Sequence, residues 1–153
     1  MIEAVDIRLV WNAIRPGIES IHAGMPWVDW IPEDLYAACI LGEAAVIVKP
    51  DTDPGDAFMI VRMDTNNRSG EKTLFIWIAW CPEEEGAASI YQDLDILGQN
   101  NGCSAIEFIT GQKKLVDFAQ QFGFKKVMYE VRKELPGPTA PIRMEPEDQN
   151  ADV

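Results

Sequence analysis

The chain has 153 residues, of which 47% are hydrophobic and 25% are charged. This size and composition predict one globular domain that buries its core without help from disulfides or metal ions. The net charge of −12 repels phosphate backbones and anionic lipids, so nucleic acids and membrane surfaces are excluded as expected partners. The same charge favours basic partners, either amines or a Lys/Arg-rich protein surface.

The N-terminal segment lacks the basic and apolar regions of a secretory signal, which predicts a cytoplasmic protein. His22 is the single histidine, so we predict no metal site and no thiol–imidazole pair, and we interpret His22 as a surface side chain. The cysteines lie far apart in apolar surroundings and are expected to be buried, reduced thiols: Cys39, Cys81 and Cys103.

The first part of the chain combines one strand pattern with two helix patterns. Apolar and polar residues alternate over 5–9, which predicts a half-buried strand with three inward side chains: Val5, Ile7 and Leu9. A helix is predicted next, and Pro16 either kinks it or begins it. Pro32, followed by acidic residues, is typical of the first turn of a second helix, which ends at Gly42.

The middle of the chain predicts an antiparallel meander of three strands, over 44–49, 57–64 and 72–81. The third of these strands is apolar on both alternating faces, which predicts a central strand covered on both sides. A helix that stops near Asn100, a buried strand over 104–110 and a helix that ends at Gly123 follow it.

The end of the chain has two parts. Residues 125–135 alternate apolar and polar side chains, which predicts a last strand. Residues 136–153 contain four prolines and four carboxylate side chains and predict a disordered acidic tail. The predicted organisation is therefore one α/β domain over 1–135 with strands and helices in the order βααβββαβαβ, followed by this tail.

Two segments resemble the GNAT acyltransferase superfamily. Residues 118–124, Phe-Ala-Gln-Gln-Phe-Gly-Phe, are similar to the family's Phe-Tyr-x-x-x-Gly-Phe type segment, and a strand closing on Arg-Lys-Glu-Leu follows. Residues 73–82 are similar to the family's fourth strand, which reaches a proline just before the acetyl-CoA loop. The resemblance covers residues 1–135 and implies a mixed central sheet of about six to seven strands flanked by about four helices. It also implies acetyl-CoA as the cofactor and transfer of an acyl group to an amine.

Members of this family bind the CoA pyrophosphate with backbone N–H groups of an Arg/Gln-x-x-Gly-x-Gly/Ala loop at a helix N-terminus. The resemblance places Gly86, Ala87 and Ala88 at that site. The Arg/Gln is absent, however, and residues 83–85 are three glutamates. Carboxylates complement the dipole at a helix N-terminus and repel an anion. The loop is therefore interpreted as a degenerate acetyl-CoA site that its own carboxylates fill.

The residues that transfer protons in the family are also replaced. Ala119 stands where many relatives carry the tyrosine that protonates the CoA thiolate, which leaves Tyr129 as the phenol candidate. Glu71, just before the strand that resembles the fourth strand, is the candidate general base. Each has a structural alternative, because Tyr129 alternates with valines on a strand and Glu71 adjoins a polar turn.

Trp27 and Trp30 lie in the connection between the first two predicted helices, which flanks the acceptor groove in the family. Exposed tryptophans form either an aromatic wall for an amine or an anchor for a protein partner. The alternative is a loop that packs back on the domain, with Trp30 next to the start of the second helix.

Two functions follow from these observations and both stay open. The first is an acetyl-CoA-dependent N-acyltransferase. The second is a non-catalytic interaction or assembly protein, which includes a homo-oligomer or a larger assembly. GNAT-like proteins with altered CoA loops occur among bacteriophage products, some of them associated with the virion, so the resemblance also makes a phage origin an expectation.

Overall fold

The structure is a computed structural model that describes residues 1–82, 84–126, 133 and 135–137, and for residues 84–89 it describes only the backbone. Most of the predicted last strand over 125–135 and most of the predicted tail therefore lie outside the described residues.

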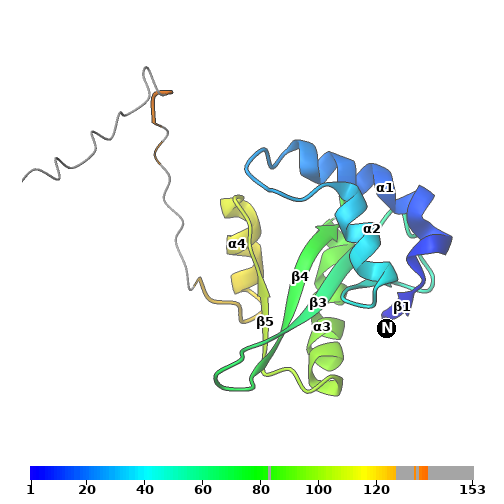
Figure 1. Cartoon of the computed structure of the whole chain (residues 1–153). Coiled ribbons are helices and arrows are strands. Elements are labelled where there is room, and N and C mark those ends of the chain that lie inside the picture. The colour runs from blue at the N-terminus through cyan, green and yellow to red at the C-terminus, as the bar shows by residue number, and fades with distance from the viewer. Residues whose placement is uncertain (83, 127–132, 134, 138–153) are drawn as a thin grey trace, which may run out of the picture.

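The described elements follow one another in the order β1, α1, α2, β2, β3, β4, α3, β5, α4 (Figure 1). Their sheet has the order β1-β2-β3-β4-β5, with antiparallel neighbours from β1 to β4 and a parallel pair between β4 and β5. The predicted α/β fold with a mixed sheet and four helices is confirmed, with five strands described in place of six to seven. The bounds are β1 Glu3–Val5, α1 Ile7–Ala23, α2 Pro32–Ile40, β2 Ala45–Val48, β3 Phe58–Thr65, β4 Lys72–Trp80, α3 Glu84–Asn100, β5 Ala105–Phe108 and α4 Lys113–Gln120.

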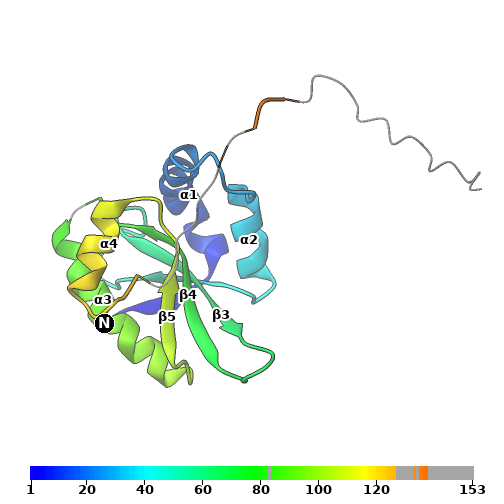
Figure 2. The ribbon, with the colours of Figure 1, turned by 90° about the vertical axis from the view of Figure 1, so that its left-hand side faces the viewer.

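Helices cover both faces of the sheet, and α4 lies beside β5 at the sheet edge (Figures 1 and 2). On one face, α1 and α2 bury a cluster that includes Ile14, Ile18 and Leu35 against β2, β3 and the end of β4. On the other face, α3 buries a second cluster around Leu94. Burial of apolar side chains in these two layers is the main stabilising term of the fold.

The predicted strand over residues 5–9 is wrong, because β1 ends at Val5 and α1 begins at Ile7. Asp6 explains the boundary, since its carboxylate accepts a hydrogen bond from the backbone N–H of Arg8 at 2.9 Å and caps the helix. Ile7 is buried inside the helix, whereas Leu9 is 85% exposed. A short alternation of apolar and polar residues fits a strand and the first turn of a helix equally well.

Helix α1 continues through Pro16, which excludes the alternative in which the helix begins at this proline. The next residue, Gly17, is buried against the sheet. A Cβ atom at Gly17 would lie 2.9 Å from Cε1 of Phe58 and 3.0 Å from Cδ2 of Trp80, so only glycine allows this close approach. Nε1 of Trp80 also donates a hydrogen bond of 3.1 Å to the carbonyl of Gly55.

Strand β4 carries a bulge that changes which face its side chains meet. Ile60 pairs with Ile78 and Val61 pairs with Ile76, so Trp77 is an extra residue on β4. Before the bulge, Ile76 belongs to the cluster under α3, and after it, Ile78 belongs to the cluster under α1. The prediction of a strand inside the sheet is confirmed, since β4 lies between β3 and β5, and side chains of its later part enter the clusters on both faces.

Aromatic side chains join α3, α4 and the segment after α4. Tyr91 stacks on Phe122 at a centroid distance of 5.3 Å and meets the edge of Phe124 at 5.7 Å. Phe124 in turn meets Phe108 of β5 at 5.4 Å. Burial raises the pKa of the Tyr91 phenol, which keeps this side chain neutral inside the cluster.

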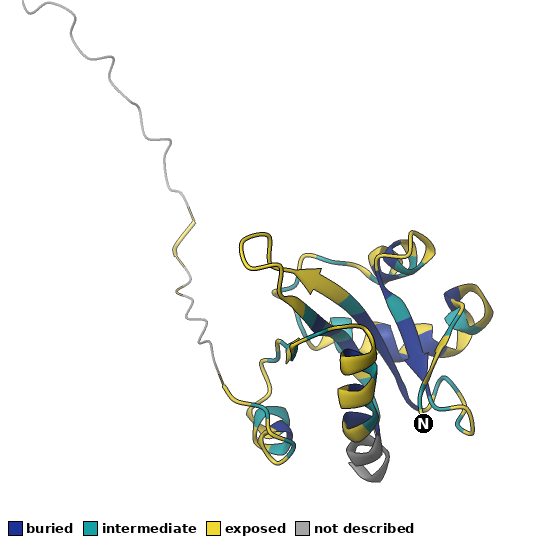
Figure 3. Cartoon of the chain, turned by 90° about the horizontal axis from the view of Figure 1, so that it is seen from below, coloured by how far each residue is buried: buried dark blue, intermediate teal, exposed yellow. Residues whose placement is uncertain are grey.

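The β3–β4 hairpin extends beyond the helices, and its end is exposed (Figure 3). Across the part of the chain that the structure describes, no helix has both the length and the apolar character of a membrane span. Nor do residues 1–82 and 84–126 gather three or more His, Cys, Asp or Glu side chains in a way that suits a metal ion. The cysteines are free thiols as predicted, although half-buried where full burial was expected: Cys39, Cys81 and Cys103.

Candidate functional site

The parallel pair β4 and β5 opens at one end, next to the start of α3. Its last paired residues are Ile76 and Phe108, where β5 ends, while β4 continues to Trp80. Helix α3 then begins at Glu84. Sheets bind ligands outside the carboxyl ends of their parallel strands, where the direction of the chain connections changes, and helix N-termini bind anions. The geometry therefore places a candidate cofactor site at this opening.

Gly86, Ala87 and Ala88 lie in the first turns of α3, at the edge of this opening. The backbone N–H groups of a first helical turn have no partner within the helix, and they can donate to an anion. Glu84 and Glu85 occupy the first two helical positions, which confirms that carboxylate residues open this helix, and Glu83 lies outside the described residues. The first two residues of α3 are thus both glutamates, directly before Gly86.

Glu71 lies at the opposite end of β4, in the β3–β4 hairpin. Its Oε1 accepts a hydrogen bond of 2.7 Å from the hydroxyl of Ser104, and its backbone N–H donates to the hydroxyl of Ser69 at 3.2 Å. Because each strand residue adds about 3.3 Å, Glu71 lies roughly 30 Å along the strand from Trp80. The structure therefore does not bring Glu71 together with Gly86, and Tyr129 lies outside the described residues.

Trp27 and Trp30 occupy different environments although they belong to one loop. Trp30 is half-buried against the cluster under α1, and its ring centroid lies 5.1 Å from that of His22. His22 is thus half-buried against this ring. Trp27 is 50% exposed, and its ring lies against Gly111 in the loop between β5 and α4. One tryptophan of the loop is therefore packed on the core, and the other is exposed at the surface.

A groove of about 980 Å³ runs beside β5, with Trp27 among the residues that line it. The groove follows β5 and reaches both faces of the sheet: on one face it is bounded by the later part of α3 and by α4, and on the other its walls include Phe75 and Glu107. Sequence reasoning missed Glu107, which is a lone carboxylate within a short, otherwise apolar strand. Strand alternation alone turns it away from Ile106 and Phe108, but no local signal shows that a groove lies there.

An arginine and two aromatic rings lie side by side on the sheet face that carries Glu107. The guanidinium carbon of Arg62 lies 4.6 Å from the ring centroid of Phe75 and 5.0 Å from that of Trp77. Its Nη2 donates a hydrogen bond of 3.3 Å to a carboxylate oxygen of Asp64. These contacts hold Phe75 in place beside Glu107, its partner across the parallel pair.

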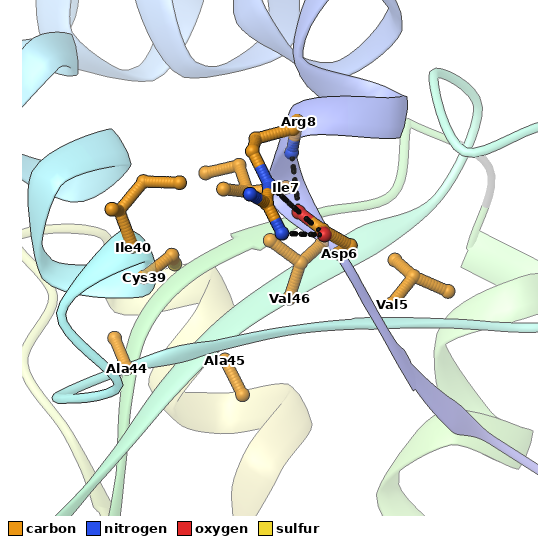
Figure 4. Close-up of a pocket in the computed structure, with 9 residues that line it drawn as sticks. All are labelled: Val5, Asp6, Ile7, Arg8, Cys39, Ile40, Ala44, Ala45 and Val46. Atoms are coloured by element: carbon orange, nitrogen blue, oxygen red, sulfur yellow. Dashed lines mark hydrogen bonds and ion pairs between the residues drawn. The ribbon is translucent and has the colours of Figure 1, made fainter.

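A second cavity, of about 230 Å³, lies between β1, the start of α1 and the end of α2 (Figure 4). Hydrogen bonds from the side chain and backbone of Arg8 lower the pKa of Asp6 from 3.8 to about 2. Burial raises the pKa of the Cys39 thiol to about 11, so this sulfur is protonated at neutral pH. The polar groups of this cavity are thus paired or neutral, and we interpret it as structural.

No protein-family model matches the chain, and no curated protein matches it in sequence. Solved structures do match. A Bacillus halodurans protein, solved as a tetramutant, has a TM-score of 0.72 and 12% identity over 88% of this chain and 99% of its own. An aminoglycoside N-acetyltransferase solved with CoA has a TM-score of 0.61 and 13% identity over 89% of this chain and 99% of its own.

A third match is an aminoglycoside acetyltransferase from an uncultured soil metagenomic sample, solved in complex with sisomicin. Its TM-score is 0.64, with 9% identity over 89% of this chain and 96% of its own. Identities this low report the shared fold, while the bound CoA and sisomicin belong to those proteins. The described chain has the fold of the GNAT acetyltransferases, which confirms the fold that the sequence resemblance implied.

Proposed function

We propose that the chain is an acyl-CoA-dependent N-acyltransferase. The observation that carries the proposal is the opening between β4 and β5, where β4 extends four residues past Ile76 to Trp80 and leads into α3. Beyond Ile76, β4 has no strand partner on the β5 side within residues 1–82 and 84–126, so its backbone N–H and C=O groups can pair with the amides of an extended pantetheine arm. The first turn of α3 offers N–H donors to the pyrophosphate, at Gly86 and Ala87.

In the proposed reaction, an amine nitrogen attacks the carbonyl carbon of the thioester. The N–C bond forms, the C–S bond breaks, and the amine proton leaves while the thiolate gains one. Holding the two reactants together supplies up to about 7–11 kcal/mol of the barrier, so positioning carries most of the rate. Tyr129 as proton donor and Glu71 as general base stay predictions, and Glu71 lies at the end of β4 away from this site, bonded to Ser104.

A second function is favoured by one specific observation, which is that Glu84 and Glu85 open α3. Two carboxylate residues at the position of a bound pyrophosphate weaken CoA binding. The alternative is therefore a non-catalytic interaction or assembly protein, for which the half-exposed Trp27 offers an anchor to a basic protein surface. A phage-encoded assembly component belongs to this alternative.

Acetyl-CoA binding, measured by calorimetry and thermal shift, separates the two functions. A ligand at one hundred times its Kd stabilises the folded state by about 2.7 kcal/mol. We expect such a shift at millimolar acetyl-CoA, and its absence would overturn the acyltransferase proposal and leave the interaction protein.

The double variant Glu84→Gln/Glu85→Gln tests the electrostatic account of the opening. Removing both charges should strengthen acetyl-CoA binding by about tenfold, because repulsion of the pyrophosphate is relieved. The matched control is Glu43→Gln/Asp51→Asn, which removes the same charge from exposed sites on other loops. Equal gains in both variants would show a general effect of net charge, and an unchanged or weaker affinity in the α3 variant would contradict this account.

A further inference from the structure

Glu107 is the carboxylate of β5 that faces away from α3. It pairs across the parallel ladder with Phe75, whereas its neighbours Ile106 and Phe108 pack against the cluster under α3. Its side chain is exposed and lines the groove beside β5. Within residues 1–82 and 84–126, the Glu107 carboxylate has no hydrogen bond or ion pair. This distinguishes it from Glu71, which the hydroxyl of Ser104 engages.

Trp27 supplies an aromatic wall to the same groove. A Cβ atom at Gly111 would lie 3.0 Å from Cζ2 and 3.2 Å from Cη2 of Trp27, so the ring rests on a residue without a side chain. Gly111 follows Glu107 by four residues, a separation of at most about 13 Å along an extended chain. Trp27 and Glu107 line the same groove, so a small organic molecule bound there can contact both.

A carboxylate next to aromatic rings is the chemistry that recognises an organic ammonium group. The guanidinium of Arg62 covers one face of the Phe75 ring, which holds the ring in place as a wall of the groove. Lys125 and Lys126 also line the groove, from the segment after α4, and make an anion the competing ligand. The overall charge of −12 favours the cation.

We propose that Glu107 binds an ammonium group of the acceptor other than the amine that attacks the thioester, and that Trp27 packs on the carbon frame between the two amino groups. The role of this groove as an acceptor site rests on the proposed acyltransferase function. Binding of the amine itself requires neither acetyl-CoA nor turnover. Glu107 is therefore a specificity-determining residue that can be tested on the protein alone.

The experiment measures binding of 1,4-diaminobutane to the full chain by calorimetry, with 1,4-butanediol as the neutral probe and succinate as the anionic probe. We expect the diamine to bind and the other two probes to bind much more weakly. Glu107→Gln should weaken diamine binding by about tenfold, because a charge-assisted contact becomes neutral. Asp95→Asn is the matched control, since Asp95 is an exposed carboxylate on α3 that lines the same groove.

Equal losses in Glu107→Gln and Asp95→Asn would show a diffuse field effect and overturn the proposal, as would absent diamine binding or preferred binding of succinate. Gly111→Ala is a second variant, whose new methyl group displaces the Trp27 ring and should weaken diamine binding severalfold. Diamine binding without acetyl-CoA binding would overturn the acyltransferase function and keep this site. If acetyl-CoA binds but Glu107→Gln leaves diamine binding unchanged, the acyltransferase function is kept and the Glu107 site is overturned.

Discussion

The sheet face on the side of α1 and α2 has two halves. In one half aromatic rings are packed in the core, and in the other they line an open groove. In the covered half, Phe58 and Trp80 press on Gly17 inside the core. In the open half, Trp27 presses on Gly111 at the surface, beside a groove. In both places a ring lies against a residue without a Cβ, but only the first contact belongs to the core cluster. A close contact in a packed core stabilises the fold, whereas the same contact at a groove positions a ring that a ligand can reach.

The two tryptophans of the loop between α1 and α2 sharpen this comparison. Trp30 belongs to the covered half through the α1 cluster and His22, and Trp27 belongs to the open half. Trp30→Ala should lower the free energy of unfolding by about 2–4 kcal/mol, because it removes a large ring from a packed site. Trp27→Ala should change it by less than about 1 kcal/mol. Urea denaturation of both variants measures the difference. Equal losses of stability would contradict the distinction between a packed Trp30 and an exposed Trp27.

The two glycines give the next largest effect. Gly17→Ala should destabilise the protein by about 1–3 kcal/mol, since the methyl group meets Phe58 and Trp80 and outweighs the better helix propensity of alanine. Gly111→Ala should be nearly neutral for stability, because the exposed ring of Trp27 can turn aside. Thermal unfolding of the two variants tests this order, and a larger loss at Gly111 would contradict it.

The smallest effect concerns the cap of α1, the helix of the covered half. The pKa of Asp6 falls from 3.8 to about 2 in the folded protein because Arg8 donates hydrogen bonds to its carboxylate. Since the folded pKa is the lower one, the carboxylate stabilises the fold above about pH 4, and this contribution is lost as the pH falls towards 2. The difference in Tm between the parent chain and Asp6→Asn should therefore shrink from pH 5 to pH 2.

Asp51→Asn is the control for this pH dependence, because Asp51 is an exposed carboxylate in a loop and caps no helix of the described residues. A pH dependence of similar size in Asp51→Asn would assign the effect to the net charge of the protein instead of the cap.

Much of the fold was predictable from local patterns. Pro32 with acidic residues after it predicted the start of α2, and the structure adds that Asp34 accepts a hydrogen bond from the backbone N–H of Ile31 at 2.8 Å. The apolar run of β4 predicted a strand covered on both sides. The boundary between β1 and α1 was predicted wrongly, because the alternation around Ile7 is too short to distinguish strand from helix.

The candidate site was less predictable, because its members come from separate elements. The position of Gly86 and of the glutamates that precede it at a helix start follows from the sequence. The groove does not, since Phe75, Glu107 and Trp27 meet only when β4, β5 and the loop between α1 and α2 are assembled.

The sequence by itself determined the elements, their order and the negative charge at the start of α3, because periodicity, capping residues and charge act over a few neighbouring positions. Only the tertiary structure decided that Trp30 packs into the core while Trp27 rests on Gly111 at an open groove. The two residues lie in one loop with similar neighbours, and what separates them is the element each one meets, which depends on contacts between distant parts of the chain.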